Sequence, residues 1–316
     1  MPPTADQTII DWTSANIADF GKAPLRLLHN MHTRPEFSES ALARLLEGLG
    51  RDDYQLTTMD TASHDLRNWR EGELGSLPGH DLLEAVKTGR IWILILGTDK
   101  LDPAYRELVH EIYAELRAHV PGFKTSREKM GILISSPNVN VYYHCDIPGQ
   151  TLWQVRGKKR VFVYPNRAPF LPQATLERIA LRETYEFMPY DPAFDADAMI
   201  FDLEPGQMLH WPLNCPHRIV NGNCLNVSFT TEHFTQSDRR TFFVNYANGV
   251  LRQRLGRQNL SRSIAGPTYW AKLGVAAAYK FTGQQKKRRK VVTVDFVVDP
   301  RSPGGVRPIP GYQVQR

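Results

Sequence analysis

The chain is poor in cysteine and lacks long apolar runs, repeats and low-complexity tracts. Its 316 residues include three cysteines, Cys145, Cys215 and Cys224, and none of them lies in a C-x-x-C pair, which argues against a structural zinc site. An odd cysteine count without a secretion signal predicts free thiols in a reducing compartment. No segment reaches the roughly 18 apolar residues that cross a bilayer, so the sequence predicts no membrane contact and a cytoplasmic location.

The composition is that of a globular protein. Hydrophobic residues make up 41% of the chain, which is enough to bury a substantial core. The length predicts one large domain or about two smaller ones. The net charge of +6 keeps an acidic partner open without deciding for one.

A His-x-Asp motif lies in residues 140–146, a run with β-strand character. Because side chains alternate along a strand, His144 and Asp146 point the same way while Cys145 points oppositely. His217, in the later segment Pro216-His217-Arg218, supplies a third ligand. Two histidines and one carboxylate on adjoining coordination positions form the facial triad of non-haem Fe(II) oxygenases. The motif therefore predicts a metal site and a redox enzyme.

The alternative is a buried hydrogen-bonded His-Asp pair without a metal. With 10 histidines and 33 acidic residues, a His-x-acid triplet arises by chance about once in this composition. Only His144, however, has an acidic residue two positions on. The β-strand pattern around it favours the metal site.

The segment after the motif reads as two strands bent around Arg156-Gly157-Lys158. Here the chain resembles the JmjC-type cupins, the 2-oxoglutarate oxygenases that include histone demethylases and the asparaginyl hydroxylase acting on hypoxia-inducible factor. The hydroxylase branch is the more similar one. The resemblance spans residues 130–235 and follows five elements in order: the motif, the Gly-x-Lys-Arg turn, a Pro-Gly segment at 201–212, the His217 segment and a closing strand at 225–230.

The resemblance implies an α+β protein, mainly β with helical flanks, built on a double-stranded β-helix, the jelly roll of a JmjC-like cupin. It implies Fe(II), 2-oxoglutarate and O2, with ascorbate as an accessory reductant. His144, Asp146 and His217 would hold the iron, and Lys159 would bind the distal carboxylate of 2-oxoglutarate. The expected activity is hydroxylation of a peptide or protein side chain, or of an amino-acid-like small molecule.

Several positions depart from the family pattern or stay open. The hydroxylase branch often has a hydroxyl residue three positions before the first iron histidine, where this chain has Val141. Lys159 then needs another helper, and Tyr142 and Ser228 are the candidates. A solvated turn residue is the alternative role for Lys159. Of the other histidines, we expect His210 in a pocket wall or the core, and His233 at the surface.

The chain divides into four predicted segments. A helix predicted at residues 103–119 begins after Asp102, and an insertion at residues 167–198 is a candidate substrate lid, with an ordinary surface loop as its rival. The predicted segments are a mainly helical flank at 1–90, the cupin barrel at 91–235, C-terminal helices at 236–283 and a basic tail with a short strand at 284–316.

Three segments bear on the partners. The acidic and aromatic stretch 183–191 would select a basic substrate at the barrel mouth by charge pairing and cation–π contact. The basic run 286–290 is expected to be a solvated linker, and nucleic-acid binding is its alternative role. We also expect a homodimer through the C-terminal helices. Two other hypotheses remain open: a non-catalytic cupin that senses a metal or ligand, and a nucleic-acid-associated protein hydroxylase recruited by the basic tail.

Overall fold

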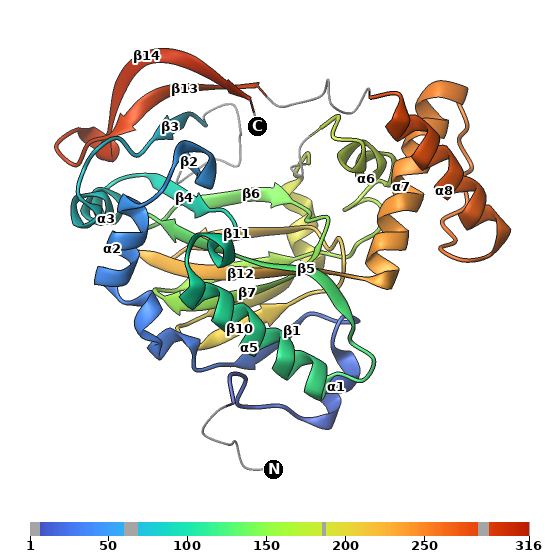
Figure 1. Cartoon of the computed structure of the whole chain (residues 1–316), viewed down its shortest axis with the longest axis horizontal. Helices are drawn as coiled ribbons and strands as arrows, with labels where there is room; N and C mark the ends of the chain where they lie inside the picture. Colours follow the sequence, from blue (N-terminus) through green and yellow to red (C-terminus); the bar gives the residue numbers. More distant parts are fainter. Residues whose placement is uncertain (1–6, 60–68, 185–187, 284–290, 316) are drawn as a thin grey trace.

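The structure, a computed structural model, describes residues 7–59, 69–184, 188–283 and 291–315. In them, two sheets face each other (Figure 1). The major sheet contains β1 (Leu25–Leu28), β2 (Tyr54–Thr58), β3 (Glu71–Glu73), β4 (Ile91–Ile95), β5 (Thr125–Ser135), β7 (Gly149–Arg156), β10 (Gln207–His210), β12 (Asn226–Thr235), β13 (Val291–Val298) and β14 (Val306–Gln315). The minor sheet contains β6 (Asn140–His144), β8 (Lys159–Val163), β9 (Met199–Leu203) and β11 (His217–Asn221).

The strand order shows how the two sheets form a jelly roll. It is β1-β10-β7-β12-β5-β4-β2-β3-β13-β14 in the major sheet and β6-β11-β8-β9 in the minor sheet. Consecutive strands such as β5 and β6, or β7 and β8, therefore belong to opposite sheets. The chain crosses repeatedly between the sheets, as expected for the predicted double-stranded β-helix.

An apolar core fills the space between the sheets. The major sheet contributes Trp92, Leu133, Leu152 and Leu209, and the minor sheet contributes Val141, Val161, Val163 and Ile219. Val161 and Val163 lie at alternate positions of β8, as one sheet face requires. The site described below opens from this inner layer.

Helices cover the other face of the major sheet (Figure 1). Trp153 of β7 stacks on Phe229 of β12 at 5.4 Å between ring centroids, and Phe37 stacks on Phe229 at 5.0 Å. This outer core also contains apolar residues of three helices, α2 (Glu39–Glu47), α3 (Gly79–Thr88) and α5 (Pro103–His119). The remaining described helices are α1 (Ser14–Asp19), α4 (Thr98–Leu101), α6 (Gln173–Ala180), α7 (Gln236–Leu255) and α8 (Gly266–Phe281).

The helix predicted at residues 103–119 is present as α5. Asp102 caps it by accepting a hydrogen bond from the Ala104 N–H at 2.8 Å, and the apolar side of the helix is buried. Ser38 caps α2, and Gly48 follows its last residue. None of the described helices has the length and apolarity needed to cross a membrane.

The first ninety residues are less helical than expected. Strands β1, β2 and β3 join the major sheet, where β1 pairs with β10 and β2 pairs with β4. These strands have three to five residues, too few to show a clear alternation in the sequence. At the other end, β13 pairs in parallel with β3, so the major sheet holds strands from both ends of the described chain. The division at residues 90, 235 and 283 stays a prediction.

Much of the insertion at 167–198 packs on the outer face of the minor sheet. Phe170, Leu176 and Ile179 share a buried cluster with Tyr143 and Phe162. Asp195 forms an ion pair with Arg218 of β11. In the acidic and aromatic stretch, Met188 is buried, and residues 185–187 lie outside the described residues. A lid function for the insertion therefore stays a prediction.

Candidate active site

The His-x-Asp motif and the distal histidine meet in the minor sheet. His144 ends β6, Asp146 follows it, and His217 opens β11. The two strands are antiparallel, with His217 directly opposite His144. Residues 73 positions apart in the chain are thus brought together by one backbone pairing.

A β-bulge lies next to this pair. Between the pairs His217 with His144 and Ile219 with Val141, Arg218 alone opposes both Tyr142 and Tyr143. Such a bulge re-aims side chains, and it explains how both Val141 and His144 serve the interior although they are three residues apart. Tyr143 instead joins the outer cluster, as does Cys145. Cys145 thus points away from His144, as predicted.

The three side chains form a compact donor set. One ligand atom from each of His144, Asp146 and His217 lies within 4.8 Å of the other two. His217 Nε2 is 3.4 Å from Asp146 Oδ2, and His144 Nε2 is 4.0 Å from Asp146 Oδ1. These separations leave room for one cation between the three groups, with imidazole and carboxylate donors that suit Fe(II).

Contacts with backbone carbonyl oxygens determine which ring nitrogen carries the proton in both histidines. Nδ1 of His144 lies 2.8 Å from the Tyr142 carbonyl oxygen, and Nδ1 of His217 lies 3.1 Å from the Cys215 carbonyl oxygen. A carbonyl only accepts, so each Nδ1 donates and each Nε2 keeps its lone pair for a metal. Burial lowers the pKa of His144 to about 4 and the pKa of His217 well below its usual value, which keeps both rings neutral.

Neighbours hold the carboxylate and shield the rings. The Asn214 amide donates to the backbone carbonyl of Asp146 at 2.6 Å, and Gln150, with its amide nitrogen turned inward, donates to the Asp146 carboxylate. The Trp211 ring lies 4.5 Å from the His217 ring. Sequence inspection missed these residues, because a lone Asn, Gln or Trp in a loop carries no motif.

Lys159 crosses the interior from one sheet to the other. It is the first residue of β8, in the minor sheet, and its Nζ donates to Ser228 Oγ of β12, in the major sheet, at 2.8 Å. The lysine is only 5% exposed, which overturns the solvated-turn alternative. Burial lowers its pKa to about 7, and no carboxylate pairs with it among the described residues.

The two candidate helpers of Lys159 have different surroundings. Ser228 contacts the lysine directly, as stated above. The Tyr142 ring packs against Trp69 at 4.4 Å and against His144 at 4.8 Å, so it lies beside the histidine pair. The structure thus brings Ser228 to Lys159 and Tyr142 to the donor set.

The remaining histidines lie outside the site. His210 is in the core, as expected, where it stacks on Phe20 at 4.0 Å. The surface position predicted for His233 is wrong, because the residue is 4% exposed and its Nδ1 is 3.2 Å from the Tyr113 hydroxyl. Tyr113 belongs to α5, so the burial of His233 results from a helix that the local sequence does not reveal.

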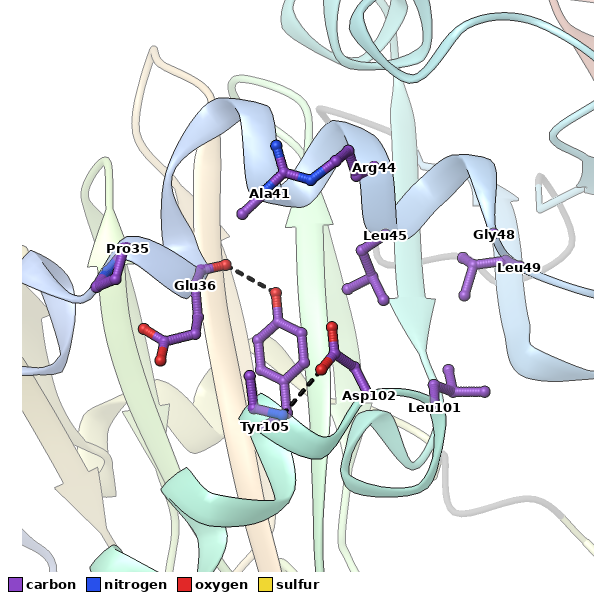
Figure 2. Close-up of a pocket in the computed structure, with 11 residues that line it drawn as sticks. Pro35, Glu36, Ala41, Arg44, Leu45, Gly48, Leu49, Leu101, Asp102 and Tyr105 are labelled. Carbon is purple, nitrogen blue, oxygen red and sulfur yellow. Dashed lines mark hydrogen bonds between the residues drawn. The ribbon is translucent and has the colours of Figure 1, made fainter.

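A separate groove on the outer side contains none of these groups. It has a volume of about 450 Å³ and lies between α2 and the start of α5 (Figure 2). Across it, the Tyr105 hydroxyl donates to the Glu36 carbonyl oxygen at 2.7 Å. Its lining includes neither the donor set nor Lys159, so we place the candidate active site between the two sheets and not in this groove.

Comparison with known proteins supports the fold. No protein-family model and no curated protein matches the chain. Among solved structures, Escherichia coli ycfD matches with a TM-score of 0.51 and 18% identity over 87% of this chain and 68% of that one. YcfD described as a ribosomal oxygenase, in complex with cobalt and 2-oxoglutarate, matches with a TM-score of 0.50 and 15% identity over 89% and 70%. The jelly-roll cupin fold is thereby confirmed, while placement in the asparaginyl-hydroxylase branch is not.

The donor set predicts metal binding that can be measured directly. We expect one Fe(II), or Mn(II) as a redox-stable substitute, per chain, and we expect Asp146→Ala to lose most of it because the only anionic donor is removed. Cys145→Ser is the matched control next in the chain, and it should keep the metal since its side chain faces the outer cluster. Full occupancy in Asp146→Ala, measured by elemental analysis, would contradict the assignment.

Proposed function

We propose that the protein is an Fe(II)- and 2-oxoglutarate-dependent oxygenase that hydroxylates a protein side chain. The proposal rests on one observation: a three-residue metal donor set and a buried lysine lie in the same space between the two sheets. His144, Asp146 and His217 offer three donors on one side of a metal position, and Lys159 offers a buried ammonium group without a carboxylate partner among the described residues.

The donor set fits iron better than it fits a structural metal. The three protein donors leave further coordination positions open, whereas structural zinc sites are closed by four. When bound, iron with 2-oxoglutarate and O2 supplies the oxidising chemistry. The chain contributes two neutral imidazoles fixed by the Tyr142 and Cys215 carbonyl oxygens, one carboxylate, and the Tyr142 and Trp211 rings that pack against the two histidines.

The buried lysine fits the distal carboxylate of 2-oxoglutarate. An ammonium group inside a protein is costly without a counter-charge. Its one described hydrogen bond goes to the neutral Ser228 hydroxyl, so an anionic ligand would supply the missing charge. Ser228, in turn, is placed to donate its own proton to the same carboxylate. The structure of YcfD with 2-oxoglutarate gives the proposal independent support.

The proposed substrate is a basic segment of a protein. The YcfD neighbour is described as a ribosomal oxygenase, which favours a protein over a small molecule. Residues 1–235 of this chain contain 23 basic and 30 acidic side chains, a net charge of −7, which favours a basic over an acidic substrate. We therefore base the expectation of a basic substrate on this net charge and not on the stretch 183–191. The three free cysteines favour a reducing compartment, and we infer a cytoplasmic location.

The experiment that tests this function is a peptide screen. Full-length protein with Fe(II), 2-oxoglutarate, O2 and ascorbate is incubated with matched lysine- and arginine-rich or glutamate-rich peptides, and mass spectrometry detects the gain of one oxygen atom. We expect oxidation of basic peptides accompanied by an equal amount of succinate. Metal and 2-oxoglutarate binding without any turnover would favour the non-catalytic sensor, and preference for acidic peptides would overturn the substrate class.

A lysine pair at the start of β8 gives a matched test of cosubstrate binding. Lys159→Ala should weaken 2-oxoglutarate binding by about 2–5 kcal/mol, the range for removing one partner of a buried charged pair, and should leave metal binding intact. Lys158→Ala is the control, because Lys158 is exposed and pairs with Glu204. Since the unliganded pKa of Lys159 is about 7, wild-type affinity should also fall as the pH rises above 7. Unchanged affinity in Lys159→Ala would show that another residue is the anchor.

The homodimer expected through the C-terminal helices gains support from α8. Tyr269, Lys272 and Ala276 of this helix are buried, and its opposite face is apolar and exposed. That face has large residues at its two ends, Trp270 at 63% and Phe281 at 92% exposure, and a glycine between them with open space around its Cα. A second copy of α8 running antiparallel would place each aromatic ring against the small residues of its partner.

The dimer is tested by one substitution on this face. Gly274→Asp puts a charge in the centre of the proposed contact and should yield a monomer in sedimentation velocity, whereas wild type should sediment as a dimer. Thr268→Asp, also exposed on α8 but outside the apolar face, should stay dimeric. A monomeric wild-type protein, or a dimeric Gly274→Asp variant, would contradict the proposal.

A further inference from the structure

Acidic and basic residues are segregated along the chain. After Asp238, the next acidic residue is Asp295, so 56 consecutive residues contain no Asp or Glu. The segment 236–283, which is α7, α8 and the loop between them, carries eight basic residues and one acidic residue. Residues 1–235, which precede it, carry the opposite net charge. Such charge asymmetry indicates a polyanionic partner for the basic part.

The basic residues concentrate around the loop that joins α7 to α8. Four arginines fall within twelve residues, Arg252, Arg254, Arg257 and Arg262. Six of the eight basic residues in 236–283 are arginines. The guanidinium group binds phosphate through two parallel hydrogen bonds and stacks on planar rings, which a lysine ammonium does not do.

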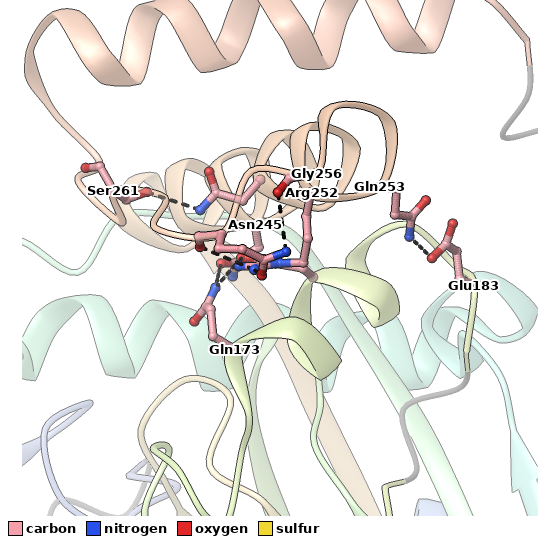
Figure 3. A network of polar contacts seen from close by, with 10 residues as sticks. Gln173, Glu183, Asn245, Arg252, Gln253, Gly256 and Ser261 are labelled. Carbon is pink, nitrogen blue, oxygen red and sulfur yellow. Dashed lines mark hydrogen bonds and ion pairs between the residues drawn. The ribbon is translucent and has the colours of Figure 1, made fainter.

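The loop is fixed in place by hydrogen bonds that use only part of these charges (Figure 3). Arg252 donates to the buried Glu177 of α6 at 2.7 Å and to the Gln258 carbonyl oxygen at 3.2 Å. Asn248 donates to the Ser261 carbonyl oxygen at 3.1 Å, and Lys272 donates to the same oxygen. The loop backbone is thus held before any partner binds, which lowers the entropy cost of docking.

Two arginines of the loop are left for a partner. Arg257 and Arg262 are exposed, and within the described ranges neither forms an ion pair with a carboxylate. Arg239, at the start of α7, and Lys280, at the end of α8, are exposed in the same way. Asn259, between the two arginines, exposes a side-chain amide that can reach a base edge.

We propose that the last turn of α7 and the loop after it, residues 252–263, form a docking surface for single-stranded RNA. Arg257 and Arg262 bind backbone phosphates and stack on unpaired bases, while Arg252 holds the loop in shape. Unpaired RNA exposes base faces and edges that a duplex hides, which fits arginine and amide side chains on one loop. This inference does not depend on the oxygenase chemistry, and it differs from recruitment by the tail, since residues 284–290 lie outside the described residues and form no part of the surface.

The test compares RNA binding by full-length variants. Binding of a labelled single-stranded RNA of about 20 nucleotides is measured by fluorescence anisotropy between 50 and 200 mM salt, where each phosphate contact contributes about −0.7 to the slope of log K against log salt. Arg257→Gln with Arg262→Gln should weaken binding and make the slope shallower by about 1.4. Replacing both arginines by lysine should preserve the slope and lose part of the affinity, because charge remains and stacking does not.

The control removes two charges elsewhere. Arg26→Gln with Arg44→Gln changes two exposed arginines on β1 and α2 and should leave RNA affinity nearly unchanged. Equal affinity of wild type and the loop variant would overturn the proposal, as would an equal loss in this control variant. Tighter binding of duplex DNA or of an acidic polypeptide, at the same number of charges, would overturn the assignment to RNA. Peptide oxidation by the loop variant reports separately on the proposed enzyme.

Discussion

The pairing of β6 with β11 is the constraint on which the candidate site depends. It sets His144 directly opposite His217, and the bulge at Tyr142 and Tyr143 determines which residues of β6 face inward. His217 could not approach His144 and the Asp146 carboxylate if the register slipped by one residue, because its side chain would then point to the other face. The backbone carbonyl oxygens that orient both imidazoles belong to the same two segments. The pairing of these two strands therefore determines both the tautomers of the histidines and the geometry of the donors.

The second half of the site depends on the distance between the sheets. Lys159 spans it from β8 to Ser228 of β12, and both residues are buried. A buried ammonium destabilises the free protein, and an anionic ligand removes that cost. The metal donors lie where β6 ends and β11 begins. Lys159, the first residue of β8, lies opposite Asn221, which is four residues further along β11 than His217. A ligand with a chelating end and a distal carboxylate suits this arrangement.

The sequence was most informative where the chemistry is local. A His-x-Asp motif in a strand indicated two donors and the later His217 a third, while the resemblance indicated Lys159. The sequence could not decide whether Ser228 or Tyr142 assists Lys159, because that depends on which strand of the opposite sheet lies across from β8. The same limit explains His233, which a distant helix covers, and β1 to β3, whose partners lie far along the chain. The resemblance placed residues 183–191 at the mouth and their composition indicated a basic substrate, although Met188 belongs to an outer core.

Calorimetric titration of 2-oxoglutarate, without O2, into protein with and without Mn(II) tests the central claim most directly. If the donor set and Lys159 hold opposite ends of one ligand, the metal should strengthen binding by roughly tenfold or more, the equivalent of at least about 1.4 kcal/mol. Equal affinity with and without the metal would contradict the account, because it would mean that the ligand does not reach the three donors.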